Sequence, residues 1–94
     1  MIQSCRDKRT HDFAAGKRIK AFSGFEHAAR MKMDRMEAAT SVKDLSALPG
    51  NRFEALKGEC KGQYSIRIND QWRIAFEWQD GAKGPSNVEI VDYH

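Results

Sequence analysis

The sequence has little cysteine and no cluster of residues typical of a metal site. Its two cysteines, Cys5 and Cys60, are too few for the disulfide framework of a small secreted domain. Its three histidines, His11, His27 and His94, are scattered, and neither a CxxC nor an HxxxH spacing occurs. We therefore expect reduced thiols, no metal ion and no cofactor.

Long apolar runs are missing as well. No stretch approaches the roughly 18 apolar residues that a membrane-spanning helix needs. Residues 1–6 lack the apolar core of a secretory signal. The sequence therefore predicts a cytoplasmic protein without a membrane partner. Its 94 residues suffice for one domain, residues 1–94, with one modest core.

Charge is present in ordinary amount, with a basic excess. Charged residues make up 31% of the chain and hydrophobic residues 40%, a balance typical of a globular chain and not of a disordered one. The formal net charge is +3, and the pI is about 9.0. This sign favours acidic partners such as RNA, but many basic proteins bind no nucleic acid. Charge alone therefore does not identify a function.

The amino-terminal half carries helical patterns. Residues 1–5 predict a short first strand. Residues 7–15 predict a helix that ends at Gly16, a residue favoured just past a helix end. Ser23 and Glu26 have the spacing of a capping box, which predicts a second helix that reaches about residue 39. One face of that helix gathers its apolar residues, Phe25, Ala29, Met33 and Met36.

The carboxy-terminal half alternates between apolar and polar residues, as strands do. The expected strands are residues 52–56, 64–68, 72–78 and 87–91. Helices followed by a meander of strands predict an α+β fold, a small antiparallel sheet with the N-terminal helices packed on one face. Trp72, Ile74 and Phe76 should point toward the helices, which leaves Arg73 and Arg67 on the polar face.

Several segments of the chain resemble a known family. The strand around Trp72 and Arg73, together with the end of the chain, is similar to the host-inhibition-of-growth (HigB) toxins of the RelE/ParE superfamily. The matching segments are residues 56–58, 63–67, 69–78 and 88–94. The resemblance implies a RelE/ParE-like toxin fold whose concave sheet carries the active site. It also implies a ribosome-dependent messenger RNA endonuclease, with a helix-turn-helix antitoxin similar to HigA as partner.

The reaction that this resemblance implies is attack of a ribose 2′-hydroxyl on the adjacent phosphate, without a metal ion. A base must take the hydroxyl proton, a cation must stabilise the phosphorane, and an acid must protonate the leaving 5′-oxygen. By matching motif, Arg73 is the phosphate clamp, because a guanidinium can bind two phosphate oxygens at once. Lys57 would be a second cation. Proton transfer, substrate positioning and stacking on a base would fall to Asp92, Tyr93 and His94.

One position departs from the family pattern. Some members carry a histidine three residues before the lysine matched by Lys57, and here Glu54 stands at that place. Either Glu54 takes the role of base, or His94 works without a second imidazole, and a weak toxin is expected. The cations expected to bind messenger or ribosomal RNA are Arg67, Lys61, Lys17, Arg18 and Lys20.

Two other functions remain open from the sequence. A toxin of the same fold could bind DNA gyrase without catalysis, as in the ParE group, and a plain RNA-binding module is a third class. Arg67 and Arg73 could also lie on a solvated sheet face, paired with glutamates across the strands, and the basic residues 17–20 could be solvated surface. The Asp92-Tyr93-His94 end favours the nuclease, because a pure binding module needs no acid–base pair there.

Overall fold

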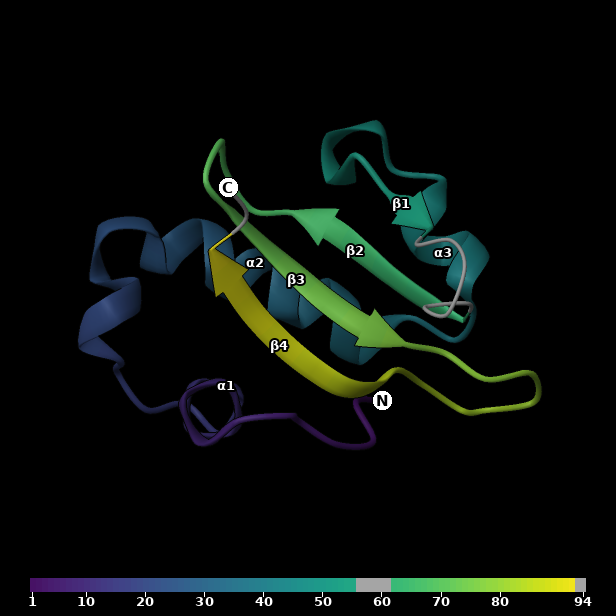
Figure 1. Cartoon of the computed structure of the whole chain (residues 1–94), viewed down its shortest axis with the longest axis horizontal. Helices are drawn as coiled ribbons and strands as arrows, with labels where there is room; N and C mark the ends of the chain where they lie inside the picture. The colour runs from purple at the N-terminus through teal and green to yellow at the C-terminus, as the bar shows by residue number, and fades with distance from the viewer. Residues whose placement is uncertain (56–61, 93–94) are drawn as a thin grey trace.

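A four-stranded antiparallel sheet has helices against one of its faces (Figure 1). This computed structural model describes residues 1–55 and 62–92. The strand order β1-β2-β3-β4 follows the chain, so the sheet is a meander, and the predicted α+β fold is confirmed. The elements in chain order are α1 (Lys8–Ala14), η1 (Lys20–Phe25), α2 (Glu26–Ala38), α3 (Val42–Ser46), η2 (Pro49–Asn51), β1 (Glu54–Ala55), β2 (Gln63–Arg67), β3 (Trp72–Glu77) and β4 (Ser86–Asp92).

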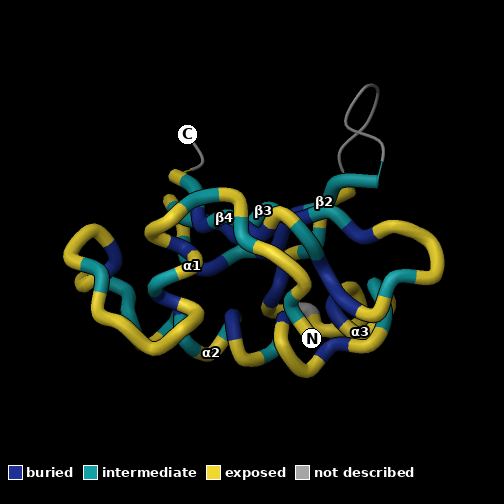
Figure 2. Tube along the Cα trace, turned by 90° about the horizontal axis from the view of Figure 1, so that it is seen from below, coloured by how far each residue is buried: buried dark blue, intermediate teal, exposed yellow. Residues whose placement is uncertain are grey.

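The core lies between the sheet and the helices, which form two layers in Figure 2. Along β4, Val88 and Ile90 are fully buried while Glu89 between them is partly exposed, which is the alternation of a strand with one covered face. The predicted apolar face of α2 is confirmed, because three of its members are buried: Ala29, Met33 and Met36. The sheet face turned away from the helices is called the open face below.

Helix α1 covers the outer edge of β4. It begins after Asp7, whose side chain accepts a hydrogen bond from the Thr10 N–H at 3.2 Å, and Gly16 follows its end with a φ of +101°, as predicted. Thr10 is fully buried, and its hydroxyl oxygen accepts a hydrogen bond from the Ile90 N–H at 3.0 Å. A backbone donor on the edge of the sheet is thereby satisfied.

We expect Thr10→Val to lower the free energy of unfolding by about 1–3 kcal/mol, because the buried Ile90 N–H loses its acceptor. The melting temperature should fall by roughly 4–8 °C for each kcal/mol in a domain of this size, as calorimetry would measure. Thr40→Val is the matched control, since the Thr40 hydroxyl bonds the exposed Asp44 carboxylate at 3.0 Å. Equal melting temperatures for the two variants would contradict the role assigned to Thr10.

The predicted strand at residues 1–5 is wrong. Among the described residues, the backbone pairing of residues 1–5 with the sheet is one isolated parallel bridge, between Cys5 and Val88. The Val88 N–H donates to the Ser4 carbonyl at 3.1 Å, and the Arg6 N–H donates to the Val88 carbonyl at 2.9 Å. Farther along β4, helix α1 occupies the edge through Thr10, so a longer pairing has no room to continue.

The predicted capping box is also wrong. Ser23 lies inside the 3-10 helix η1, and α2 begins at Glu26 after Phe25, without a side-chain cap. The 3-10 geometry places residues three apart on the same side. This brings Phe22 and Phe25 together against Trp72, with ring centroids at 5.8 and 4.8 Å. Packing of aromatic rings on the sheet therefore outweighs the local capping preference.

Candidate active site

Arg73 points to the open face, as predicted, but it is buried there, with only 8% of its surface exposed. The alternative of a solvated sheet face is wrong for Arg73, because its side chain lies along the sheet and is held by hydrogen bonds. Its Nε donates to the Ser65 hydroxyl at 2.9 Å, and its Nη2 donates to the Arg52 carbonyl at 2.6 Å and the Ser65 carbonyl at 3.3 Å. These hydrogen bonds orient the guanidinium on the open face.

The backbone around the Arg52 carbonyl, which holds Arg73, is itself fixed by contacts with α2 and α3. Arg52 has a φ of +42°, in the left-handed region that side chains other than glycine rarely adopt. The preceding Asn51 is fully buried, donates to the Leu45 carbonyl at 3.0 Å, and accepts from the Lys32 ammonium at 2.6 Å. Contacts from α2 and α3 therefore set the position of the catalytic candidate on the sheet.

Two further candidates share the open face with Arg73. Arg67 is its register partner across β2 and β3, and its guanidinium bonds the Asp70 carboxylate. Glu54 on β1 lies opposite Ser65, the residue that holds Arg73, and its side chain is exposed. The fold therefore brings a carboxylate and two guanidinium groups to one part of the open face.

Asp92 lies at the end of the sheet and is one position out of step with Arg73. Its register partner is Trp72, whereas Arg73 pairs with Val91. The Asp92 carboxylate is exposed and accepts a hydrogen bond from the Gln71 side-chain amide at 2.8 Å. Four predicted site residues lie outside the described part of the chain: Lys57, Lys61, Tyr93 and His94.

Positive charge gathers near this end of the sheet. Burial lowers the pKa of the Lys32 ammonium, and the positive charges of Arg35 and Arg67 lower it further. Lys32, Arg35 and Arg67 therefore lie close enough together to form a region of positive potential. Clustered cations of one sign concentrate anionic ligands.

The basic residues at positions 17–20, which lead from α1 to η1 and are called the connector below, lie toward the same end of the sheet. Lys17 and Arg18 keep 68% and 86% of their side chains exposed, each in a surface ion pair. Lys20, also exposed, begins η1, whose Phe22 packs against Trp72, the residue before Arg73. Exposed ion pairs of this kind contribute little to stability, so these cations can exchange partners.

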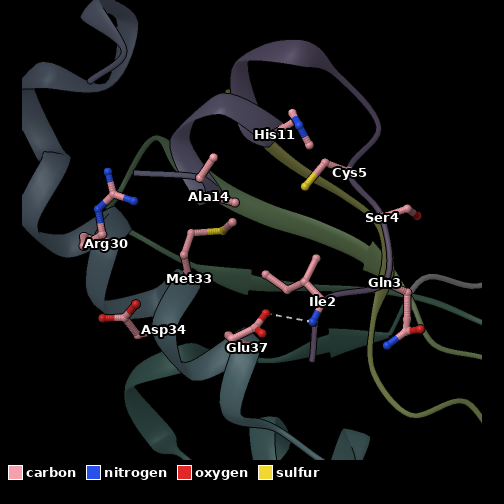
Figure 3. A pocket seen from close by; sticks show the side chains of 11 residues that line it. Ile2, Gln3, Ser4, Cys5, His11, Ala14, Arg30, Met33, Asp34 and Glu37 are labelled. Carbon is pink, nitrogen blue, oxygen red and sulfur yellow. Dashed lines mark hydrogen bonds between the residues drawn. The ribbon is translucent and has the colours of Figure 1, made fainter. Parts of the chain in front are cut away.

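A hollow of about 490 Å³ lies between residues 2–5, α1 and α2 (Figure 3). Cys5 and His11 both line it, as a cysteine nucleophile and its base would. Burial raises the pKa of the Cys5 thiol, and the nearby Asp7 carboxylate raises it further. The thiol is therefore held in its protonated, weakly nucleophilic form. None of the lining residues belongs to the open face, so this hollow is separate from the Arg73 site.

Metal clusters and spanning helices are not found in the described part of the chain. Across residues 1–55 and 62–92, no group of three or more histidine, cysteine, aspartate and glutamate side chains could hold a metal ion. Within the same ranges, every helix is too short or too polar to cross a membrane.

The sequence prediction missed the residues that position Arg73. Ser65 could have been found, because strand alternation places it on the polar face beside the arginines. The contact with the Arg52 carbonyl could not, because any residue carries a carbonyl and only the tertiary structure decides where it points.

Comparisons with known proteins agree with the fold. A family model described as RelE-like toxin of type II toxin-antitoxin system HigB matches residues 4–94. Toxin HigB-1 of Vibrio cholerae serotype O1 is 48% identical over 59 residues, which are 63% of this chain and 62% of that protein. An uncharacterized protein of Haemophilus influenzae is 33% identical over 49 residues, 52% of this chain and 48% of its own. The match spans less than two thirds of the length of either relative.

A solved structure is similar over the whole chain. The YoeB-YefM complex from Staphylococcus aureus aligns with 100% of this chain and 98% of its own chain, with a TM-score of 0.59. Sequence identity is 17%, so this likeness supports the fold alone. The family model covers nearly every residue, including all four strands that carry the candidate site. This chain therefore belongs to the RelE-like toxins of type II toxin–antitoxin systems, in the HigB family.

Proposed function

We propose that this toxin is a ribosome-dependent endoribonuclease that cleaves messenger RNA and so inhibits translation. The observation that carries the proposal is the Arg73 guanidinium, held in place on the open face by Ser65 and Arg52 beside Arg67. A guanidinium fixed before the substrate arrives needs no reorganisation when charge develops on a phosphate.

The proposed reaction is the one that the family resemblance implies, with roles given to groups on this face and to the end of the chain. The ribose 2′-hydroxyl attacks the adjacent phosphorus, Arg73 stabilises the phosphorane oxygens, and the bond from phosphorus to the 5′-oxygen breaks. Glu54, exposed near Arg73, is a candidate to accept the 2′-hydroxyl proton. His94 is the candidate to protonate the leaving 5′-oxygen. The products are a 2′,3′-cyclic phosphate and a free 5′-hydroxyl.

The remaining candidates support binding and orientation. Lys57 would add a second cation, Tyr93 would stack on a base, and Asp92 would orient His94 or the substrate from the end of the sheet. Contacts with RNA would also come from the other predicted cations: Arg67, Lys61, Lys17, Arg18 and Lys20. The exposed lysine and arginine side chains of the connector suit salt-dependent docking on ribosomal RNA.

The proposal includes a partner and a compartment. The family description places its toxins in type II toxin-antitoxin systems, and the similar YoeB structure is a complex with YefM. We propose a helix-turn-helix antitoxin similar to HigA as the partner that holds this toxin silent. Because its targets would be ribosomes and messenger RNA, the toxin would act in the cytoplasm.

Expression of the toxin without its antitoxin is expected to stop protein synthesis before DNA synthesis. Pulse labelling with an amino acid and with thymidine measures both rates in one culture. Primer extension on a message in a translating extract should show new 5′ ends that need both the toxin and the ribosome. If thymidine incorporation falls first and no new ends form, binding to gyrase replaces the nuclease as the better reading.

A further inference from the structure

A small pocket lies on the open face, beginning at Ala75, two residues along β3 from Arg73, and extending toward Glu77. Its volume is about 130 Å³, which is room for roughly four water molecules at liquid density. A pocket of this size can take one edge of a flat polar ring and is too small for a folded peptide. The side chains that line it from four different segments include Arg6, Gln63, Glu77, Asn87 and Glu89.

A β-bulge shapes this pocket. The register between β3 and β4 shifts between Ala75 and Glu77, and Asn87 in the extra length of β4 has a φ of +50°. The Asn87 side-chain amide donates to the Glu77 carboxylate at 2.7 Å, and its backbone N–H donates to the Ser4 hydroxyl at 2.9 Å. Bulges and left-handed backbone of this kind concentrate where a side chain is aimed for a function.

The two carboxylates of the pocket differ in what they bind. Glu77 accepts from Asn87 and also from the Arg6 guanidinium at 3.3 Å, which reaches it from the amino-terminal segment beside β4 (Figure 1). Glu89 is partly exposed and lies opposite Ala75. Among the described contacts, no side-chain hydrogen bond or ion pair involves Glu89. Glu77 is therefore committed to building the pocket, whereas Glu89 presents acceptor oxygens to it.

We propose that this pocket receives one base of the RNA and that Glu89 reads the amino group of that base. The inference rests on the proposed endonuclease function and names a specificity determinant for it. A carboxylate can only accept hydrogen bonds. Guanine offers two neighbouring donors, its ring N–H and its amino group, and adenine and cytosine offer one amino group. Uracil carries no amino group and places carbonyl oxygens on either side of its single N–H. The expected preference is guanine first and uracil last.

The position of the pocket suits a nucleotide next to the cleaved bond. Glu89 lies opposite Ala75, which is two residues along β3 from Arg73, a spacing of roughly 7 Å in a strand. A phosphate held by Arg73 would therefore place the adjoining base near Glu89. With one arginine and two glutamates, the pocket repels phosphate, so a base edge enters it in preference to the backbone.

Titration of the purified toxin with nucleotide monophosphates, followed by amide chemical shifts, tests the pocket directly. Guanosine monophosphate should shift the signals of residues 75–77 and 87–89, and inosine monophosphate, which lacks only the amino group, should bind roughly 5- to 100-fold more weakly. Glu89→Gln should bring guanosine, inosine and uridine monophosphates to similar affinities, because an amide also donates. Asp34→Asn also turns a carboxylate into an amide, at an exposed residue of α2, and it should leave the preference intact. Equal binding of the nucleotides to the unaltered toxin, binding of none of them, or a preference that survives Glu89→Gln each overturns the proposal.

A map of cleavage sites separates this inference from the function on which it rests. In a translating extract, the toxin should disfavour uracil at one position beside the cut, and Glu89→Gln should admit uracil there while it still cleaves. Cleavage by both proteins at identical sites overturns the role of Glu89. If the unaltered toxin cuts no message, the proposed function fails, and the titration alone then decides whether the pocket discriminates between bases.

Discussion

Arg73→Ala is expected to reduce messenger RNA cleavage by at least about 100-fold, because one preorganised donor to a developing oxyanion contributes about that much. The same change should also destabilise the protein. Arg73 is 8% exposed and donates hydrogen bonds to the Ser65 hydroxyl and the Arg52 carbonyl. Truncation to alanine removes the donor from both of these acceptors. A loss of about 1–3 kcal/mol in the free energy of unfolding follows. Circular dichroism gives the melting temperature, and primer extension below the lower of the two melting temperatures gives the rate.

Two further variants separate charge, orientation and folding. Arg73→Lys keeps the positive charge but loses the planar fork, so a large part of the cleavage defect should remain. Ser65→Ala keeps the guanidinium but removes the hydroxyl that orients it, and an intermediate rate is expected. Lys43→Ala, an exposed cation on α3, should cleave at the unaltered rate. If Arg73→Ala loses stability and yet cleaves normally, Arg73 is a structural residue only.

His94→Gln is expected to reduce cleavage by roughly 100- to 10,000-fold, the usual contribution of a general acid or base. The motivation is the resemblance at Asp92-Tyr93-His94 together with the register of β4, which pairs Val91 with Arg73. His94 itself lies outside the described residues. The variant should also lose one limb of the pH–rate profile, because its side chain no longer takes up or releases a proton. Single-turnover cleavage across pH 5–9 measures both effects.

His27→Gln is the matched control, because His27 is exposed on α2, the helix layer opposite the open face. Its rate and pH profile should equal those of the unaltered toxin. Should His94→Gln cleave as fast as the His27 variant, the proton must come from another group. Glu54→Gln, measured alongside, then asks whether the exposed carboxylate near Arg73 carries the proton transfer instead.

The sequence predicted the sheet face on which the candidate arginines lie, but neither their burial nor their register with Asp92. Alternation along β3 correctly assigns Arg73 and Arg67 to the face away from the helices, since neighbouring side chains in a strand must point to opposite sides. Alternation does not fix how far a side chain is buried, however, and Arg73 is covered, which excludes the alternative of a solvated sheet face for it. The register between β3 and β4, which alternation does not give, puts Asp92 level with Trp72, so Asp92 lies at the end of the sheet and not directly across from Arg73.

Local patterns by themselves determined the α+β class, the apolar face of α2, the end of α1 at Gly16 and the polar face that carries Arg73. Each of these follows from interactions within a few residues along the chain, where spacing is enough. The tertiary structure alone decided that η1 replaces the capped start of α2, that the Arg52 carbonyl holds Arg73, and that Arg6 meets Glu77 across β4. Those outcomes depend on contacts between segments far apart in the chain, whose energies outweigh local preference and leave no periodic trace in the sequence.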